Sequence, residues 1–276
     1  GVRMPEGPEI RRAADEIAGI LVGREVVDAE FNVPALAPFA GKVTGSQVTA
    51  VDTRGKAMLT RFDNGLVMYS HNQLYGRWFA VRRPHLPSTK RQLRVALHTL
   101  THSALLYSAS DIEIFDAAEE HQHPFLKRAG PDILDDTLTA DAVVARLGAA
   151  DFRNRALGNL YLDQGFLAGN GNYLRSETLW AARLNPFCRP SAIDAAGLKR
   201  LARETLAIAR RSYRTRGVTV PDKVARKRRA TGMSYEQYRF QVYGRDGLPC
   251  YRCGAIVERL ACGSRSIFIC PECQAR

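Results

Sequence analysis

Two neighbouring residues near the start of the chain, Pro5 and Glu6, combine a secondary amine with a carboxylic acid. If Met4 is the initiator and is removed, Pro5 presents a free amine that stays nucleophilic near neutral pH and can form an iminium with an aldehyde carbon. Glu6 would stand beside this amine and could protonate a ring oxygen during the attack. Three residues precede Met4 as the chain is written, so this chemistry requires a mature protein that begins at Pro5.

A second group of chemically capable residues lies near the other end of the chain, where four of the six cysteines form two C-x2-C pairs. Two such turns place four thiolates close enough to close a tetrahedral zinc site, and the bound metal would supply folding energy that so short a segment lacks. A pair of disulfides is the alternative, but the spacing and a cytoplasmic compartment count against it. The predicted ligands of one structural Zn²⁺ are Cys250, Cys253, Cys270 and Cys273.

Positive charge is concentrated around these cysteines. Residues 199–276 hold 18 of the 40 Lys and Arg residues but only 6 of the 28 Asp and Glu residues, whereas residues 1–198 are neutral overall. Such a basic end indicates either a surface that binds a polyanion or a solubilising surface. Arg265 lies between the two cysteine pairs, where its guanidinium could contact a phosphate or simply occupy an exposed turn.

Length and composition describe an ordinary folded protein. With 276 residues, 45% of them hydrophobic, the chain has enough apolar material for about two domains. No apolar stretch approaches the ~18 residues of a membrane span, and the first residues lack the apolar core of a secretory signal. We therefore expect a cytoplasmic protein that is not bound to a membrane.

The hydrophobic pattern changes along the chain. Apolar residues recur at helical spacing from Ile10 to Leu21, and from Glu25 to about Tyr107 short Val-, Leu-, Thr- and Tyr-rich segments alternate with turn residues. The sequence DNG at 63–65 predicts a hairpin, and strands at this spacing are typical of a sandwich or barrel-like sheet. The basic stretch 217–238 predicts a mobile linker or loop. Helices are expected at about 139–147, 154–167, 172–183 and 191–213.

Four motifs, in this order, resemble those of the formamidopyrimidine-DNA glycosylase and endonuclease VIII family of base-excision repair enzymes. They are MPEGPE at 4–9, TRGK at 53–56, GNGNYLR at 169–175 and the C-terminal cysteine pairs. The segment SHNQLYG at 70–76 resembles the endonuclease VIII branch, although the basic region around 226–229 looks longer than that branch would have. The resemblance implies a bifunctional DNA glycosylase and AP lyase that removes oxidised pyrimidines by β,δ-elimination.

The resemblance also implies roles for individual residues. Pro5 would attack C1′ of the damaged nucleotide, and Glu6 would be the proton donor for opening of the sugar ring. Lys56 would be a second proton donor. Once the base has left the stack, a wedge would fill the gap in the duplex. The residues of this wedge would be Gln73, Leu74 and Tyr75.

Further residues would contact the DNA backbone. Arg265 would hold a phosphate and assist δ-elimination, and Asn172 would bind phosphate at a helix N-terminus. Arg128 resembles another DNA-contacting position. Glu177 would organise the site without taking part in catalysis. The partner would be damaged double-stranded DNA, and we expect a monomer associated with the nucleoid through DNA binding.

The architecture implied is α+β. We expect an N-terminal β-sandwich with flanking helices at 4–135, a helix–two-turn–helix domain with a basic loop at 136–238, and a zinc ribbon hairpin at 239–276. Two other functions stay open at this point. One is a member of the same family directed at oxidised purines, and the other is a catalytically silent binder of DNA damage, if Pro5 is not exposed as an amine.

Overall fold

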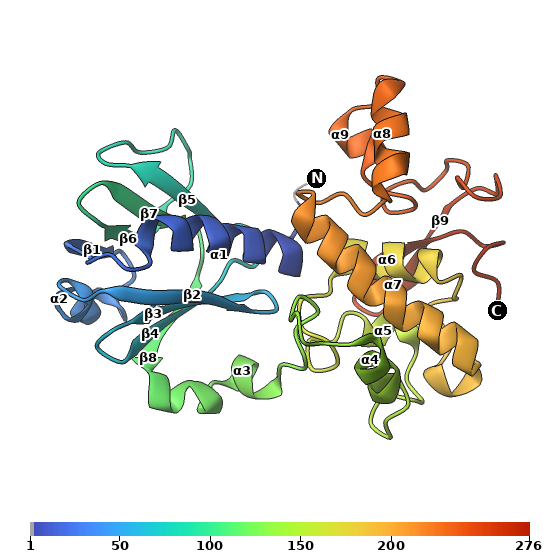
Figure 1. Cartoon of the computed structure of the whole chain (residues 1–276), viewed down its shortest axis with the longest axis horizontal. Helices are drawn as coiled ribbons and strands as arrows, with labels where there is room; N and C mark the ends of the chain where they lie inside the picture. The colour runs from blue at the N-terminus through green and yellow to red at the C-terminus, as the bar shows by residue number, and fades with distance from the viewer. Residues whose placement is uncertain (1–2) are drawn as a thin grey trace. The chain divides into compact units, whose positions relative to one another are not determined.

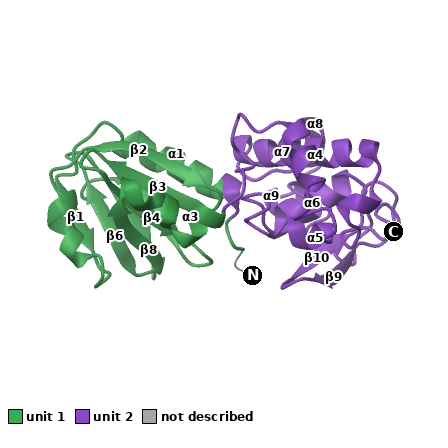
Figure 2. Ribbon diagram, turned by 90° about the horizontal axis from the view of Figure 1, so that it is seen from below, with its two compact units in different colours: residues 1–5, 9–128 green, residues 6–8, 129–276 purple. Residues whose placement is uncertain are grey.

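The computed structural model describes residues 3–276 and consists of two compact units. Figure 2 colours them separately: the first contains Glu9–Arg128 and the residues up to Pro5, and the second contains Glu6–Pro8 and Ala129–Arg276. The chain boundary between them near the N-terminus therefore falls inside the MPEGPE motif. None of the helices described between residues 3 and 276 is long and apolar enough to cross a membrane.

The first unit is a sandwich of two four-stranded antiparallel sheets (Figure 1). One sheet has the strand order β1-β6-β7-β5 and the other has the order β2-β3-β4-β8. Residues from both sheets and from helix α1 (Gly7–Leu21) share one hydrophobic core. The strands are β1 (Asp28–Phe31), β2 (Val48–Arg54), β3 (Ala57–Phe62), β4 (Leu66–His71), β5 (Arg77–Arg82), β6 (Leu93–His98), β7 (His102–Tyr107) and β8 (Asp111–Asp116).

Local sequence accounts for several of these elements. In α1, Ile10, Ala14, Ile17 and Leu21 are buried, and their spacing places them on one helical face that packs into the core. The predicted hairpin is present, since β3 and β4 pair on either side of Gly65, which has a φ of +85°. Short helices α2 (Ala40–Val43) and α3 (Pro124–Arg128) flank the sandwich, as predicted.

The second unit is mainly helical and ends in a β-hairpin. Thr139 caps the first of its helices by accepting a hydrogen bond from the N–H of Ala142, and Asp194 caps a later one through the N–H of Gly197. The expected α+β architecture is therefore confirmed. The elements are α4 (Ala140–Leu147), α5 (Leu157–Leu160), α6 (Asn172–Ala181), α7 (Ala195–Arg214), α8 (Asp222–Ala230), α9 (Tyr235–Tyr238), β9 (Glu258–Cys262) and β10 (Arg265–Ile269).

Two of the sequence-based predictions for this unit were wrong. The helix expected at 154–167 is reduced to α5, because a turn follows it in which Asp163 accepts the N–H of Gly165 through its side chain and the N–H of Phe166 through its carbonyl. The stretch 217–238 is not a loop throughout but contains α8 and α9. Helix α8 was missed because most of its side chains are charged, while burial of Ala225 and Arg228 leaves only a weak periodic signal.

Candidate functional site

The carboxylate of Glu6 lies at the N-terminus of α6 in the second unit. Its two oxygens accept hydrogen bonds from the main-chain N–H groups of Tyr173, at 2.7 Å, and Leu174, at 3.2 Å, and only 2% of the residue is exposed. The first N–H groups of a helix have no partner within it, and they carry the positive end of the helix dipole. The start of α6 therefore holds this acidic side chain in one place.

Glycines make this close approach possible. The N–H of Gly7 donates to the carbonyl of Gly169, which has a φ of +104°, and a Cβ on Gly7 would lie 2.9 Å from the Cα of Gly169. A Cβ on Gly171 would lie 2.3 Å from Cδ of Glu6. The GNG turn at 169–171 therefore forms a surface without side chains, against which the MPEGPE segment packs.

Arg175 joins this turn to the β-hairpin, a role that the sequence did not predict. Its side chain is fully buried, and its Nε donates to Oδ1 of Asn172 at 2.9 Å. Its two terminal nitrogens donate to the carbonyls of Gly158, Cys262 and Arg265, at 2.8 to 3.2 Å. Burial lowers the pKa of Arg175, but a guanidinium still fits a site made of carbonyl oxygens. One signal was available in the sequence: Arg175 follows Asn172 by three positions, so both side chains lie on one face of the helix predicted at 172–183.

Arg175 thereby positions two of the predicted phosphate-binding residues. Asn172 is the first residue of α6, next to the N–H groups that hold Glu6, and Arg265 is the first residue of β10. Arg265 pairs with Cys262 across the hairpin turn, and its carbonyl is tied to Arg175 while its side chain is half-buried. The structure thus brings Glu6, Asn172 and Arg265 into one connected part of the second unit.

The four predicted zinc ligands form a cluster in the second unit. The sulfur atoms of the cysteines at 250, 253, 270 and 273 all lie within 4.8 Å of one another. Zn–S bonds of ~2.3 Å in a tetrahedron give sulfur separations of about 3.8 Å, so the donor set fits a structural zinc ion. Burial opposes ionisation of the Cys250 thiol, but N–H groups of Arg252 and Cys253 and the Trp180 indole outweigh it and lower its pKa to about 6. Cys188 and Cys262 lie outside this cluster.

In the first unit, Lys56 lies in the tight turn between β2 and β3. The turn begins at Gly55, which has a φ of +59°, and Lys56 is 8% exposed. Burial is the main cause of the lowered pKa of His71 on β4; Asp111 raises that pKa, and the charge of Lys56 lowers it further. The ammonium group of Lys56 therefore lies close enough to His71 to affect its protonation. The predicted second proton donor is therefore not a freely solvated loop lysine.

The predicted wedge residues lie in a turn directly after β4. Gln73 has a φ of +52°, its N–H donates to Nδ1 of His71 at 3.0 Å, and Tyr75 is 62% exposed. The turn closes at Gly76, whose N–H donates to the carbonyl of Asn72 and where a Cβ would lie 2.6 Å from that oxygen. This geometry presents Gln73 and Tyr75 to solvent, with Leu74 half-buried between them.

The remaining predicted residues are less constrained. Pro5 is half-buried and ends the N-terminal segment that belongs to the first unit. Arg128, the last residue of α3, is exposed, and its Nε donates to the carbonyl of Pro124 at 3.2 Å. His71 links the wedge turn to the neighbourhood of Lys56.

Glu177 organises the chain that leads into the hairpin. The carboxylate is buried and accepts hydrogen bonds from the Thr219 hydroxyl and from the N–H groups of Gln241, Val242 and Tyr243. Burial raises the pKa of Glu177 above its ordinary value, although these four hydrogen bonds act in the opposite direction. The contacts support the organising role predicted for this residue.

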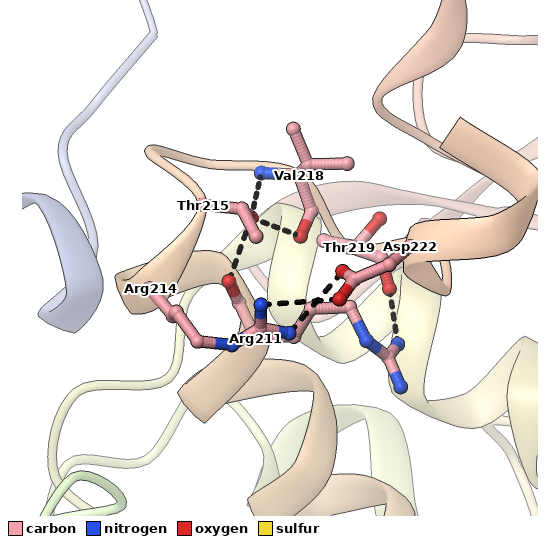
Figure 3. Close-up of polar contacts among 6 residues, drawn as sticks. All are labelled: Arg211, Arg214, Thr215, Val218, Thr219 and Asp222. Carbon is pink, nitrogen blue, oxygen red and sulfur yellow. Dashed lines mark hydrogen bonds and ion pairs between the residues drawn. The ribbon is translucent and has the colours of Figure 1, made fainter. Parts of the chain in front are cut away.

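The connection from α7 to α8 is held by polar contacts (Figure 3). Arg211 donates to the carbonyl of Thr219 at 2.6 Å, and both terminal nitrogens of Arg214 contact the carboxylate of Asp222 at 3.1 and 3.2 Å. The hydroxyl of Thr215 donates to the carbonyls of Arg211 and Val218. These contacts order the first part of the stretch that the sequence indicated as a linker.

The chain is similar to known proteins both in sequence and in structure. The formamidopyrimidine-DNA glycosylase N-terminal domain matches residues 4–110, and the formamidopyrimidine-DNA glycosylase H2TH domain matches residues 129–223. The structure is similar to that of Lactococcus lactis Fpg in complex with a DNA containing N7-benzyl-Fapy-dG. The TM-score is 0.81 and the sequence identity 19%, over 99% of this chain and 100% of the other. MutM in complex with DNA containing carbocyclic 8-oxo-G gives the same TM-score and coverage, at 20% identity.

The chain belongs to the formamidopyrimidine-DNA glycosylase family. Within it, the chain is similar to Endonuclease 8 of Klebsiella pneumoniae, at 48% identity, and of Escherichia coli, at 47%. Both matches cover 98% of this chain and 100% of the relative. The resemblance, the fold, the structural zinc site and the enzyme class of DNA glycosylase and AP lyase, all expected from the sequence, are thereby confirmed.

Proposed function

We propose that this protein excises oxidised pyrimidines from double-stranded DNA and then cleaves the strand at the resulting abasic site. Similarity to Endonuclease 8 over the whole length supports this substrate class. The observation that carries the proposal is the carboxylate of Glu6, held by two N–H groups of α6 directly after the residue that would be the nucleophile. A reaction that forms a covalent sugar adduct needs such a positioned acid.

In the proposed reaction, the secondary amine of Pro5 attacks C1′ of the damaged nucleotide and the bond from C1′ to the base breaks. Glu6 takes the proton that the amine of Pro5 releases and donates it to the ring oxygen, so the sugar opens and an iminium forms between Pro5 and C1′. The iminium withdraws electrons from C2′, and loss of a C2′ proton expels the 3′ phosphate. Loss of a proton from C4′ then expels the 5′ phosphate in a second elimination, and water hydrolyses the remaining iminium, which frees the amine of Pro5. Lys56 is the further proton donor.

Binding of the DNA would use residues of both units. The side chains of Gln73, Leu74 and Tyr75 fill the gap left by the extruded nucleotide, because an apolar body with hydrogen-bonding ends replaces both stacking and base pairing. Asn172 and Arg265, positioned by Arg175, bind phosphate oxygens. Arg128 is a further backbone contact.

Reductive trapping tests the proposal. Protein whose N-terminus has been mapped to Pro5 should form a stable adduct with duplex DNA containing thymine glycol when borohydride is added. Pro5→Ala protein should form at least ~100-fold less, because the adduct requires the secondary amine. Glu6→Gln should lose base excision by at least ~100-fold yet still cleave DNA with a pre-formed abasic site. Equal trapping when the mapped N-terminus is Gly1 would show that Pro5 is not the nucleophile.

A further inference from the structure

A cavity in the second unit lies away from every residue assigned above to the reaction. It measures about 530 Å³ and is formed by α8, the segment that follows α8, the first cysteine turn and the last part of α6. Trp180 lies eight residues after Asn172 on α6, which corresponds to ~12 Å along the helix axis. An occupant of this cavity would therefore approach α6 at the opposite end from Glu6.

Three of the lining residues form an apolar part of the cavity, which we call its floor. Trp180, Val224 and Met233 contribute hydrophobic side chains from three different segments, and a volume of this size is typical of a site that accepts a ligand group. Trp180 is nearly buried, whereas Val224 and Met233 are half-buried. Such a floor favours a bulky apolar side chain over a hydrated polar group.

Three other lining residues form a positively charged part of the cavity, which we call its rim. Lys227, Arg228 and Arg252 line it, and no carboxylate of residues 3–276 is among the lining side chains. Arg228 already donates to two carbonyls and to Gln241, and Arg252 donates to the carbonyl of Trp180 at 3.0 Å. Because these guanidinium groups already donate hydrogen bonds within the protein, their main contribution at the rim is a positive electrostatic potential.

Tyr251 forms a wall of the cavity, and both faces of its ring are covered. The guanidinium carbons of Arg228 and Arg245 each lie 3.7 Å from the ring centroid. Two guanidinium groups so close to one centroid must lie on opposite faces, because on the same face they would overlap. The ring therefore has no face left on which a nucleobase could stack, which disfavours single-stranded DNA as the occupant.

We propose that this cavity docks an acidic peptide segment of a partner protein, which inserts an apolar side chain between Trp180 and Met233. Carboxylates flanking that side chain match the cationic rim, and the apolar floor accepts the anchor. The attraction is partly electrostatic and partly hydrophobic, so binding weakens with salt without being abolished. The docking does not depend on the proposed reaction.

Fluorescence anisotropy of the full-length protein with the labelled peptide Asp-Glu-Asp-Asp-Leu-Phe tests this proposal. We expect a Kd of ~10–100 µM at low salt. Replacing Phe by Ala in the peptide, or its four acidic residues by their amides, should each weaken binding by about tenfold. Met233→Glu and Lys227→Glu should weaken binding similarly, since they place a negative charge on the floor or on the rim.

The control is Lys199→Glu, which makes the same charge change on an exposed position of α7 and should leave peptide affinity unchanged. Met233→Glu should excise thymine glycol at the rate of the unmodified protein. The proposal is overturned by an absence of binding up to ~500 µM peptide. It is also overturned if Lys227→Glu and Met233→Glu weaken the binding of duplex DNA while the peptide does not bind, since the cavity would then be a DNA contact.

Discussion

The carboxylate of Glu6 accepts a hydrogen bond of 2.7 Å from the main-chain N–H of Tyr173, a residue 167 positions further along the chain. This contact attaches the predicted acid to the first turn of α6 and not to the β-sandwich that contains most of the N-terminal half. Glu6, the GNG turn at 169–171 and Arg265 of the hairpin therefore all belong to the second unit. Variants of the residues around Glu6 test what depends on this contact.

Gly171→Ala should displace Glu6, because the added Cβ would lie 2.3 Å from its Cδ. A displacement of about 1 Å in a proton donor costs on the order of 100-fold in rate, so single-turnover excision of thymine glycol should fall by at least that factor. The matched control is Gly148→Ala at the end of α4, where the nearest atoms are 3.7 Å from the added Cβ. Excision by Gly171→Ala protein at the control rate would mean that Glu6 is not constrained as described.

Arg175→Lys should destabilise the second unit. An ammonium group keeps the charge but cannot reproduce the planar fork that joins Asn172 to the carbonyls of the hairpin turn, so we expect a loss of about 2–4 kcal/mol in the free energy of unfolding. Urea denaturation measures this loss. Arg203→Lys on the exposed side of α7 should change it by less than about 0.5 kcal/mol. Equal values for the two variants would contradict the proposed positioning role of Arg175.

Zinc removal should be visible in the fluorescence of Trp180, whose indole N–H donates to the sulfur of Cys250 at 3.4 Å. Chelation, or Cys253→Ser, should unfold the hairpin segment, shift the emission of Trp180 and weaken DNA binding by at least ~10-fold, because the metal supplies the folding energy there. Cys188→Ser lies outside the cluster and should change neither signal. Retention of the hairpin after complete metal removal would be the contrary result.

Acid should loosen the wedge turn through His71. Its Nδ1 accepts the N–H of Gln73, which only the neutral imidazole can do, and burial, reinforced by the charge of Lys56, lowers the pKa of His71 against the opposing effect of Asp111. A lowered pKa in the folded state means that the stability contribution is complete above the unfolded value of about 6.5 and is lost as the pH falls below it.

Urea midpoints measured between pH 7.5 and pH 5 should therefore decline more for the unmodified protein than for His71→Asn. The asparagine keeps an acceptor for Gln73 but does not titrate. Equal declines for the two proteins would show that the pKa of His71 is the same in the folded and unfolded states, so that its protonation does not affect the stability of the turn.

Local features of the chain were enough to predict much of this molecule. The spacing of the cysteines indicated the zinc cluster, the apolar positions from Ile10 to Leu21 indicated α1, and DNG at 63–65 indicated the turn between β3 and β4. Each of these signals depends on residues that are close in the sequence and share one geometric requirement. The four motifs also indicated the family, because they consist of the residue types that the chemistry of that family requires.

Other features depend on contacts that no local pattern contains. The basic run around 226–229 indicated a solvated loop, yet Arg228 is buried. Its guanidinium donates hydrogen bonds to the carbonyls of Tyr238 and Phe240. Arg175 has an ordinary place in a helix and becomes a structural link only because the hairpin turn lies against α6.

From the sequence alone, the residue types, their family and the local elements could be determined, since hydrophobic period, turn propensity and ligand spacing act over a few residues. The tertiary structure alone decided which helix end holds Glu6, which cations are buried and which remain at the surface. A charged group stays buried only where hydrogen-bond partners from distant segments offset its loss of water, and those partners are brought together only when the chain folds.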